Sequence, residues 1–76
     1  MIYEKLFTIQ LPIQMSIGKS VPAQILFGMR GDTDKVSIYI VEVNCVNVTR
    51  SGDVRDQMTL IERKCRENLS TAKHLN

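Results

Sequence analysis

Residue types on which catalytic and metal sites depend are scarce in this sequence. It has one histidine, two cysteines and no tryptophan among 76 residues. The histidine, His74, has no second histidine with which to form a zinc site, and Cys45 and Cys65 do not form a C-x-x-C motif. We therefore predict a protein that is not an enzyme and needs no metal or cofactor. We interpret both cysteines as buried structural thiols.

Long apolar runs and an excess of one charge are also missing. No apolar stretch approaches the ~20 residues that a membrane-spanning helix needs, and Glu4 and Lys5 interrupt the first segment where a secretory signal would be apolar. Ten basic and eight acidic side chains are mixed along the chain and leave a net charge of +2. These features favour a cytoplasmic protein with reduced thiols and without a membrane partner.

The triplet Gly18-Lys19-Ser20 is how a nucleotide-binding P-loop ends, but the rest of that motif is absent. The pattern requires a first glycine five positions before Gly18, where this sequence has Ile13. The residues after Ser20 are typical of a strand, whereas a P-loop leads directly into a helix. We therefore predict a loop between two strands and expect no small-molecule ligand. The two aspartates of "GDTD" are interpreted in the same way, as turn formers rather than as a calcium site.

Three segments alternate between apolar and polar residues with period two, which is the pattern of strands with one buried face. They predict strands over about 2–11, 22–30 and 35–48, with Pro12 ending or bending the first strand or placing its far end at an edge. The third segment is apolar on both faces, which indicates a central strand or one with a partner on its second face. Its first face has Val36, Ile38 and Ile40, its second face has Tyr39, Val41, Val43 and Cys45, and we expect a bulge near Cys45-Val46.

The last third of the chain changes to a helical period. Asp53 is a suitable N-cap, and we predict one amphipathic helix over about 54–70, followed by a frayed C-terminus over 71–76. Its apolar stripe consists of Val54, Met58, Ile61, Cys65, Leu69 and Ala72. The fold class that follows is α+β: a three-stranded antiparallel β-meander and one C-terminal helix (β-β-β-α), forming a single domain over 1–76.

One helix can cover only one face of such a sheet, so apolar side chains remain on the other face. We expect Leu6, Leu26, Tyr39 and Val41 to form an interaction surface. A chain this short has a thin margin of stability, which favours a homodimer or a larger protein partner. The leading hypothesis is a small accessory or regulatory protein that acts by protein–protein binding.

The alternative hypothesis is a nucleic-acid-binding regulator that uses a basic helix face. The candidate residues are Arg55, Arg63, Lys64 and Arg66, with Lys73 nearby in the sequence. Glu62 and Glu67 dilute this positive charge, so a solvated helix face with local ion pairs is the competing interpretation. The sequence does not identify a partner in either case.

Overall fold

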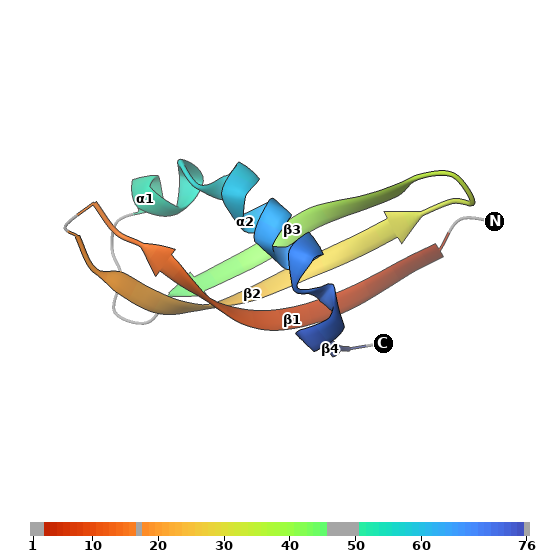
Figure 1. Cartoon of the computed structure of the whole chain (residues 1–76), viewed down its shortest axis with the longest axis horizontal. Coiled ribbons are helices and arrows are strands. Elements are labelled where there is room, and N and C mark those ends of the chain that lie inside the picture. Colours follow the sequence, from red (N-terminus) through yellow and green to blue (C-terminus); the bar gives the residue numbers. More distant parts are fainter. Residues whose placement is uncertain (1–2, 17, 46–50, 76) are drawn as a thin grey trace.

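The structure, a computed structural model, describes residues 3–16, 18–45 and 51–75 of the chain. Within these ranges the elements are β1 (Tyr3–Gln14), β2 (Ser20–Gly31), β3 (Val36–Cys45), α1 (Ser51–Arg55), α2 (Met58–Glu67), the 3₁₀ turn η1 (Leu69–Thr71) and β4 (Lys73–His74). The strands form one antiparallel sheet in the order β3-β2-β1-β4. Figure 1 shows the meander with the helices crossing it diagonally. The predicted α+β fold is confirmed, with a short fourth strand added.

The long hairpin of β1 and β2 closes through a turn at Gly18. This glycine has a φ of 88°, in the left-handed region that side-chain-bearing residues rarely adopt. The Met15 N–H donates to the Lys19 carbonyl oxygen at 2.7 Å, and the Gly18 N–H donates to the Met15 carbonyl oxygen at 3.0 Å. Ser20 then begins β2 rather than a helix. Gly18-Lys19-Ser20 therefore belongs to a hairpin turn, as predicted.

Two prolines face each other in this hairpin without breaking it. Pro12 of β1 is directly opposite Pro22 of β2. Neither proline has an N–H group, so this pair must occupy a position where the two strands exchange no hydrogen bonds. The strand β1 therefore continues to Gln14 and does not end near residue 11 as predicted. On its other edge β1 pairs with β4 only at Phe7 and Thr8, so Pro12 lies in an edge segment.

The strand β3 contains a bulge, but not at the predicted position. Phe27 of β2 pairs with Ile40 and the preceding Leu26 pairs with Glu42, so Val41 is the additional residue. Beyond the bulge the two faces of β3 exchange. Val43 and Cys45 consequently pack against the core, on the same side as Ile38 and not beside Tyr39 as predicted. The residue Val46, where the bulge was expected, lies outside the described residues.

The predicted single helix is divided into two helices. The Asp56 N–H still donates to the Gly52 carbonyl oxygen at 3.0 Å, but the Gln57 N–H donates to Val54, three residues back. The amide side chain of Gln57 donates to the Gln14 carbonyl oxygen at the end of β1. This contact with the sheet holds a turn between α1 and α2. Because α1 begins at Ser51, Asp53 is inside a helix and is not its N-cap; the side chain of Asp53 is not described.

The C-terminal segment is not frayed as predicted, because it returns to the sheet. The helix α2 ends where the Asn68 side chain donates to the Lys64 carbonyl oxygen at 2.8 Å. After η1, β4 pairs with β1, and the Leu75 N–H donates to the Leu6 carbonyl oxygen at 2.9 Å. The ring of His74 lies 5.2 Å from that of Phe7, measured between centroids. Backbone pairing therefore orders a segment that has little helix propensity.

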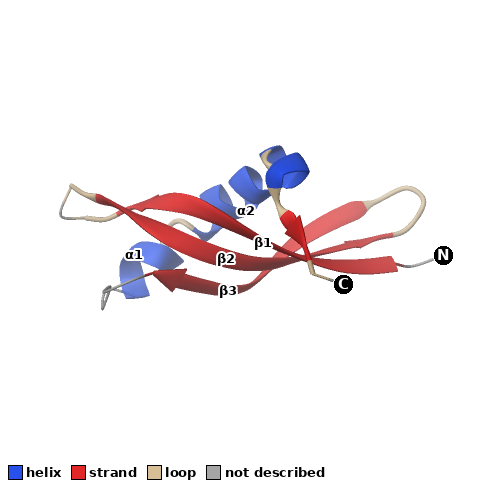
Figure 2. Cartoon of the chain, turned by 90° about the horizontal axis from the view of Figure 1, so that it is seen from below, coloured by secondary structure: helices blue, strands red, loops and turns tan. Residues whose placement is uncertain are grey.

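The core lies between the helices and one face of the sheet. Its buried apolar residues are Phe7, Leu11, Ile13, Met15, Ala23, Ile25, Phe27, Ile38, Ile61 and Cys65. Phe7 and Phe27 stack across β1 and β2 with their centroids 5.5 Å apart. The whole predicted helical stripe packs on this core, with Ile61 and Cys65 as its buried members. Figure 2 shows the strong twist of the sheet along its length.

Candidate interaction surface

The structure separates the predicted interaction residues into two groups. Leu6, Leu26 and Tyr39 lie on the face of the sheet opposite the core and are half-buried. Val41 lies at the bulge of β3, with 51% of its surface exposed. The basic residues Arg55, Arg63, Lys64 and Arg66 are on the helices, which pack on the other face. The two groups therefore cannot form one continuous surface, and we describe them separately.

On the outer face of the sheet, Tyr39 lies over a glycine. Its ring fills the space next to Gly28, because a Cβ atom added to Gly28 would lie 2.1 Å from Cζ of Tyr39. This arrangement shields a glycine in a strand interior, where the missing side chain otherwise leaves the sheet poorly packed. Gly28 is consequently buried although it faces away from the core. Tyr39 is therefore a structural part of the sheet as well as a surface residue.

An ion pair extends this arrangement across β1, β2 and β3. Arg30 donates from Nε and Nη2 to Oε2 of Glu4, at 2.9 and 2.7 Å, and its guanidinium carbon lies 5.6 Å from the centre of the Tyr39 ring. Hydrogen bonds from Arg30, and secondly from Tyr39, lower the pKa of Glu4. Desolvation, and secondly the hydrogen bond to Glu4, raises the pKa of Tyr39. This end of the outer face is thus occupied by internal contacts.

The centre of the outer face is hollow and is lined mostly by residues with polar side chains. A hollow of about 280 Å³ is lined by Thr8, Gln24, Leu26, Glu42, Asn44 and Leu75. Thr8, Gln24 and Asn44 also line a neighbouring hollow of about 500 Å³ that reaches Thr71 and Lys73 at the β1 edge. Both are open to solvent and offer hydroxyl and amide groups, and Gln24 Nε2 already donates to Thr8 Oγ1 at 3.1 Å. Such a surface can accept hydrogen-bonding partners, but it does not place a base beside a nucleophile.

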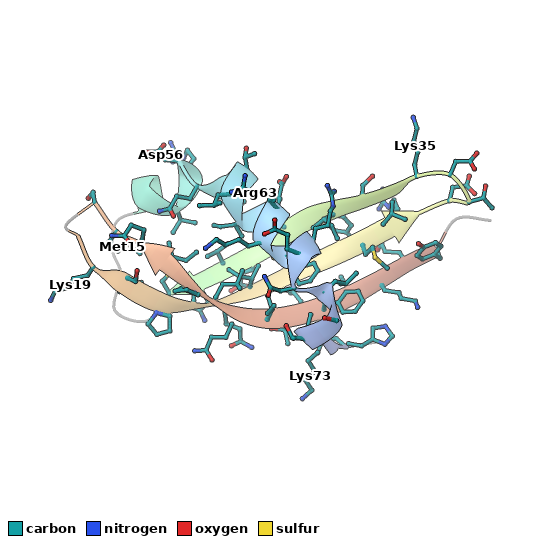
Figure 3. The ribbon with its side chains drawn as sticks, viewed as in Figure 1. Met15, Lys19, Lys35, Asp56, Arg63 and Lys73 are labelled. Atoms are coloured by element: carbon teal, nitrogen blue, oxygen red, sulfur yellow. The ribbon has the colours of Figure 1, made fainter. Side chains whose placement is uncertain are left out.

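The basic side chains are dispersed over three elements. Arg55 ends α1, Arg63 and Arg66 are exposed on α2, and Lys73 is on β4. Figure 3 shows Arg63 on α2 and Lys73 directed away from the helix at the edge of the sheet. Lys64 is half-buried and lines a small hollow with residues of the β1–β2 hairpin. The structure therefore leaves Arg63 and Arg66, three residues apart, as the exposed basic pair on α2.

The outer edge of β3 is a surface that the sequence analysis did not identify. The sequence indicated a central strand, which is wrong because β3 is the edge strand of the described sheet. Within residues 3–16, 18–45 and 51–75, no strand pairs with this edge. Val36, with 49% of its surface exposed, and Val41 are both on β3. The run from Val36 to Val41 has neither the charges nor the prolines that usually mark an edge strand, so the sequence carried no signal for this edge.

The hydrogen-bonding direction along β3 follows from the proline pair. Hydrogen-bonded and non-hydrogen-bonded pairs alternate along an antiparallel ladder, so the even residues of β2, from Gln24 to Arg30, direct their N–H and C=O groups toward β3. Their partners on β3 include Ser37 and Tyr39, which therefore face inward in the ladder. The backbone groups of Val36, Ile38 and Ile40, the residues between and beside these partners, point outward. They form the free hydrogen-bonding edge of the sheet.

The thiols and the histidine do not form a common site. Cys65 is fully buried, and burial, with a smaller contribution from Glu62, raises its pKa to about 11. Cys45 is half-buried, and burial raises its pKa as well. Both thiols are free. In the part of the chain that the structure describes, no three His, Cys, Asp or Glu side chains are grouped so that they could hold a metal ion.

Comparison with known proteins gives no match for this chain. No protein-family model matches it, and no curated protein or solved structure is significantly similar to it. None of the helices in the described ranges combines the length and the apolar character needed to cross a membrane. The function has to be inferred from the surfaces themselves.

Proposed function

We propose that this chain is a small accessory or regulatory protein that acts by protein–protein binding, self-associates and performs no chemistry of its own. The observation that supports the proposal is the position of its exposed large apolar side chains. Among the described residues these are Val36, Val41 and Leu75, with about half of each side chain exposed. Val36 and Val41 lie on β3, whose outer edge is unpaired within the described residues, and Leu75 follows β4 at the other edge of the sheet.

The size of the chain supports a partner for this surface. A domain of about 60 residues buries only about 60% of the surface that its unfolded chain exposes, so its own core gives a thin margin of stability. Here one thin helical layer covers one face of a sheet, and the molecule is extended, with principal dimensions of 44 × 20 × 18 Å. Association that buries Val36 and Val41 would add apolar burial that the monomer cannot provide.

The solution mass of the full chain tests this proposal. Light scattering behind size exclusion, over a range of micromolar concentrations, should give twice the mass of one chain and a shift toward the monomer on dilution. A monomer at every concentration would contradict self-association. The outer face would then be the remaining surface for a different protein partner.

Nucleic-acid binding is the second candidate function, and the exposure of Arg63 and Arg66 on α2 favours it. Two basic side chains three residues apart share one side of a helix and can contact neighbouring phosphates. Binding by this route should weaken steeply with added salt and should be lost when Arg63 or Arg66 is replaced by glutamate. No binding of duplex or single-stranded probes at low salt would exclude it.

We also propose that the protein works in the cytoplasm. The free thiols of Cys45 and Cys65 support this location, because a reducing compartment keeps cysteines in that form. Localisation of a fluorescently tagged full-length chain tests it.

A further inference from the structure

The free edge of β3 has one regular segment, and its midpoint is a specific residue. The turn over residues 32–35 limits this segment on one side, where the Asp32 N–H donates to the Lys35 carbonyl oxygen at 2.9 Å. The bulge at Val41 limits it on the other side. Between these limits, Val36, Ile38 and Ile40 present outward N–H and C=O groups at regular spacing. The segment is therefore symmetrical about Ile38.

We propose that a second copy of this chain pairs antiparallel with β3, with the two-fold axis at Ile38, so that two sheets become one. This inference rests on the proposed self-association and adds the surface and the register. Ile38 would exchange both backbone hydrogen bonds with its equivalent, and Val36 would pair with Ile40 of the other copy. A register shifted by two residues would pair part of the segment with the bulge in one direction or with the turn in the other, and would lose part of this ladder.

The side chains fit this register on the core face. Residues directly opposite each other in an antiparallel ladder point to the same face, so half-exposed Val36 would pack against half-buried Ile40 of the second copy. The run from Val36 to Ile40 has no charged residue and no proline, which are the usual features that prevent edge strands from pairing.

The two-fold axis also relates the layers of the two copies. It is perpendicular to the sheet, so both sets of helices would lie on the same face and the core would continue across the joint. Figure 1 shows that the β2–β3 hairpin extends beyond the helices. The axis reverses the strand direction, so it would bring the helical end of one copy alongside the uncovered hairpin end of the other.

Charged side chains flank the segment and would meet across the two-fold axis in this arrangement. Lys35 lies just before the segment and Glu42 lies just after the bulge, and both are exposed. In the register centred on Ile38, Lys35 of one copy is opposite Val41 of the other and next to its Glu42. Asp34 is opposite that Glu42, so Lys35 is the basic group that offsets the repulsion between the two carboxylates. The two-fold axis produces this Lys–Glu contact twice.

A charge-swap experiment on the full chain tests the register. Analytical ultracentrifugation should show that Lys35→Glu weakens the dimer by about tenfold or more, because only carboxylates would then face Glu42 of the other copy at both ends of the segment. The double variant Lys35→Glu/Glu42→Lys should recover most of the affinity. Lys19→Glu makes the same charge change at the opposite end of the sheet (Figure 3) and should have no such effect. A dimer whose affinity does not change in Lys35→Glu would overturn this inference but leave self-association in place.

A proline variant tests the backbone pairing itself. The N–H group of Val36 points outward, so Val36→Pro removes a donor of the proposed ladder without removing a hydrogen bond to β2. We expect a monomer with an unchanged circular dichroism spectrum. A dimer that persists in Val36→Pro, or wild-type assemblies that grow beyond two chains, would overturn the inference. A wild-type monomer at every concentration would overturn both the inference and the self-association on which it rests.

Discussion

The substitution Gly28→Ala tests how Tyr39 packs on the outer face of the sheet. The new Cβ atom would lie 2.1 Å from Cζ of Tyr39, whereas carbon atoms in good contact are about 3.5–4.0 Å apart. The ring must therefore move by more than about 1 Å. It would then lose its contacts with Gly28 and with the guanidinium group of Arg30. The space that the ring now fills would be only partly refilled by one methyl group.

The expected size of the effect follows from two opposing contributions. Strain from an added methylene-sized group costs about 1–3 kcal/mol. The preference for alanine over glycine in a strand interior offsets about 0.5–1 kcal/mol of this cost. We expect Gly28→Ala to lower the free energy of unfolding by about 1 kcal/mol, which corresponds to a decrease in Tm of about 4–8 °C for a domain of this size.

The sign of this effect should reverse when the ring is absent. The Tyr39→Ala background removes the three atoms nearest to the new methyl group, so Gly28→Ala should then stabilise the protein by about 0.5–1 kcal/mol. Urea unfolding of the four proteins, with unchanged m values, measures both effects. Gly52→Ala is a control, because no atom of the described residues beyond its chain neighbours and its own helix backbone lies within 4 Å of the added Cβ, and the change should have the same sign in both backgrounds. Equal effects of Gly28→Ala in the two backgrounds would refute the proposed packing.

Three further predictions concern the contact between the helix and the sheet. Ile61→Ala should lower the free energy of unfolding by about 2–4 kcal/mol, because Ile61 is only 1% exposed. The control Thr59→Ala, on the exposed side of α2, should change it by less than about 0.5 kcal/mol. Similar effects of the two substitutions in urea unfolding would show that Ile61 does not hold the helix on the sheet. With Ellman's reagent at pH 8, Cys45 should react before Cys65, whose pKa of about 11 leaves about one thiol in a thousand ionised; equal rates would contradict the burial of Cys65. Because the pKa of Cys65 is raised in the folded protein, the unfolded chain loses the thiol proton at a lower pH than the folded chain does. The contribution of this thiol to the free energy of unfolding should therefore be fully present below about pH 9 and should decrease as the pH rises toward 11. Cys65→Ala should show a shallower alkaline decrease, and an identical pH profile would show that Cys65 does not cause it.

The two kinds of periodicity in the sequence were sufficient for the fold class. Alternation predicted strands with one buried face, and Phe7, Leu11 and Ile25 lie on the face that the structure buries; the helical stripe included Ile61 and Cys65, which are also buried. These predictions succeeded because burial of one face imposes a period of two on a strand and about 3.6 on a helix, whatever lies opposite. The hairpin turn at Gly18 was equally local, since its positive φ favours glycine directly.

The errors all arose where a distant segment decided the local structure. The turn at Gln57 depends on the end of β1, and the ordered residues Lys73–His74 depend on the backbone of Phe7 and Thr8. The continuation of β1 through Pro12 depends on the opposite proline, Pro22. None of these partners is near in the sequence, so local propensity predicted one helix, a frayed end and an early strand end.

The candidate surface was predicted only in part for the same reason. Leu6, Leu26 and Tyr39 were correctly assigned to the face opposite the core, because side-chain alternation fixes which residues share a face. That Tyr39 covers Gly28 instead of being available to a partner required the register between β2 and β3.

The sequence by itself determined the composition of the core and the order of strands and helix, because burial periodicity and turn residues act over a few neighbouring positions. Only the tertiary structure decided that β3 is an edge strand with a bulge at Val41 and that its free backbone groups are centred on Ile38. Strand order and register are set by pairing between segments far apart in the chain, and a single inserted residue exchanges the two faces from that point onward.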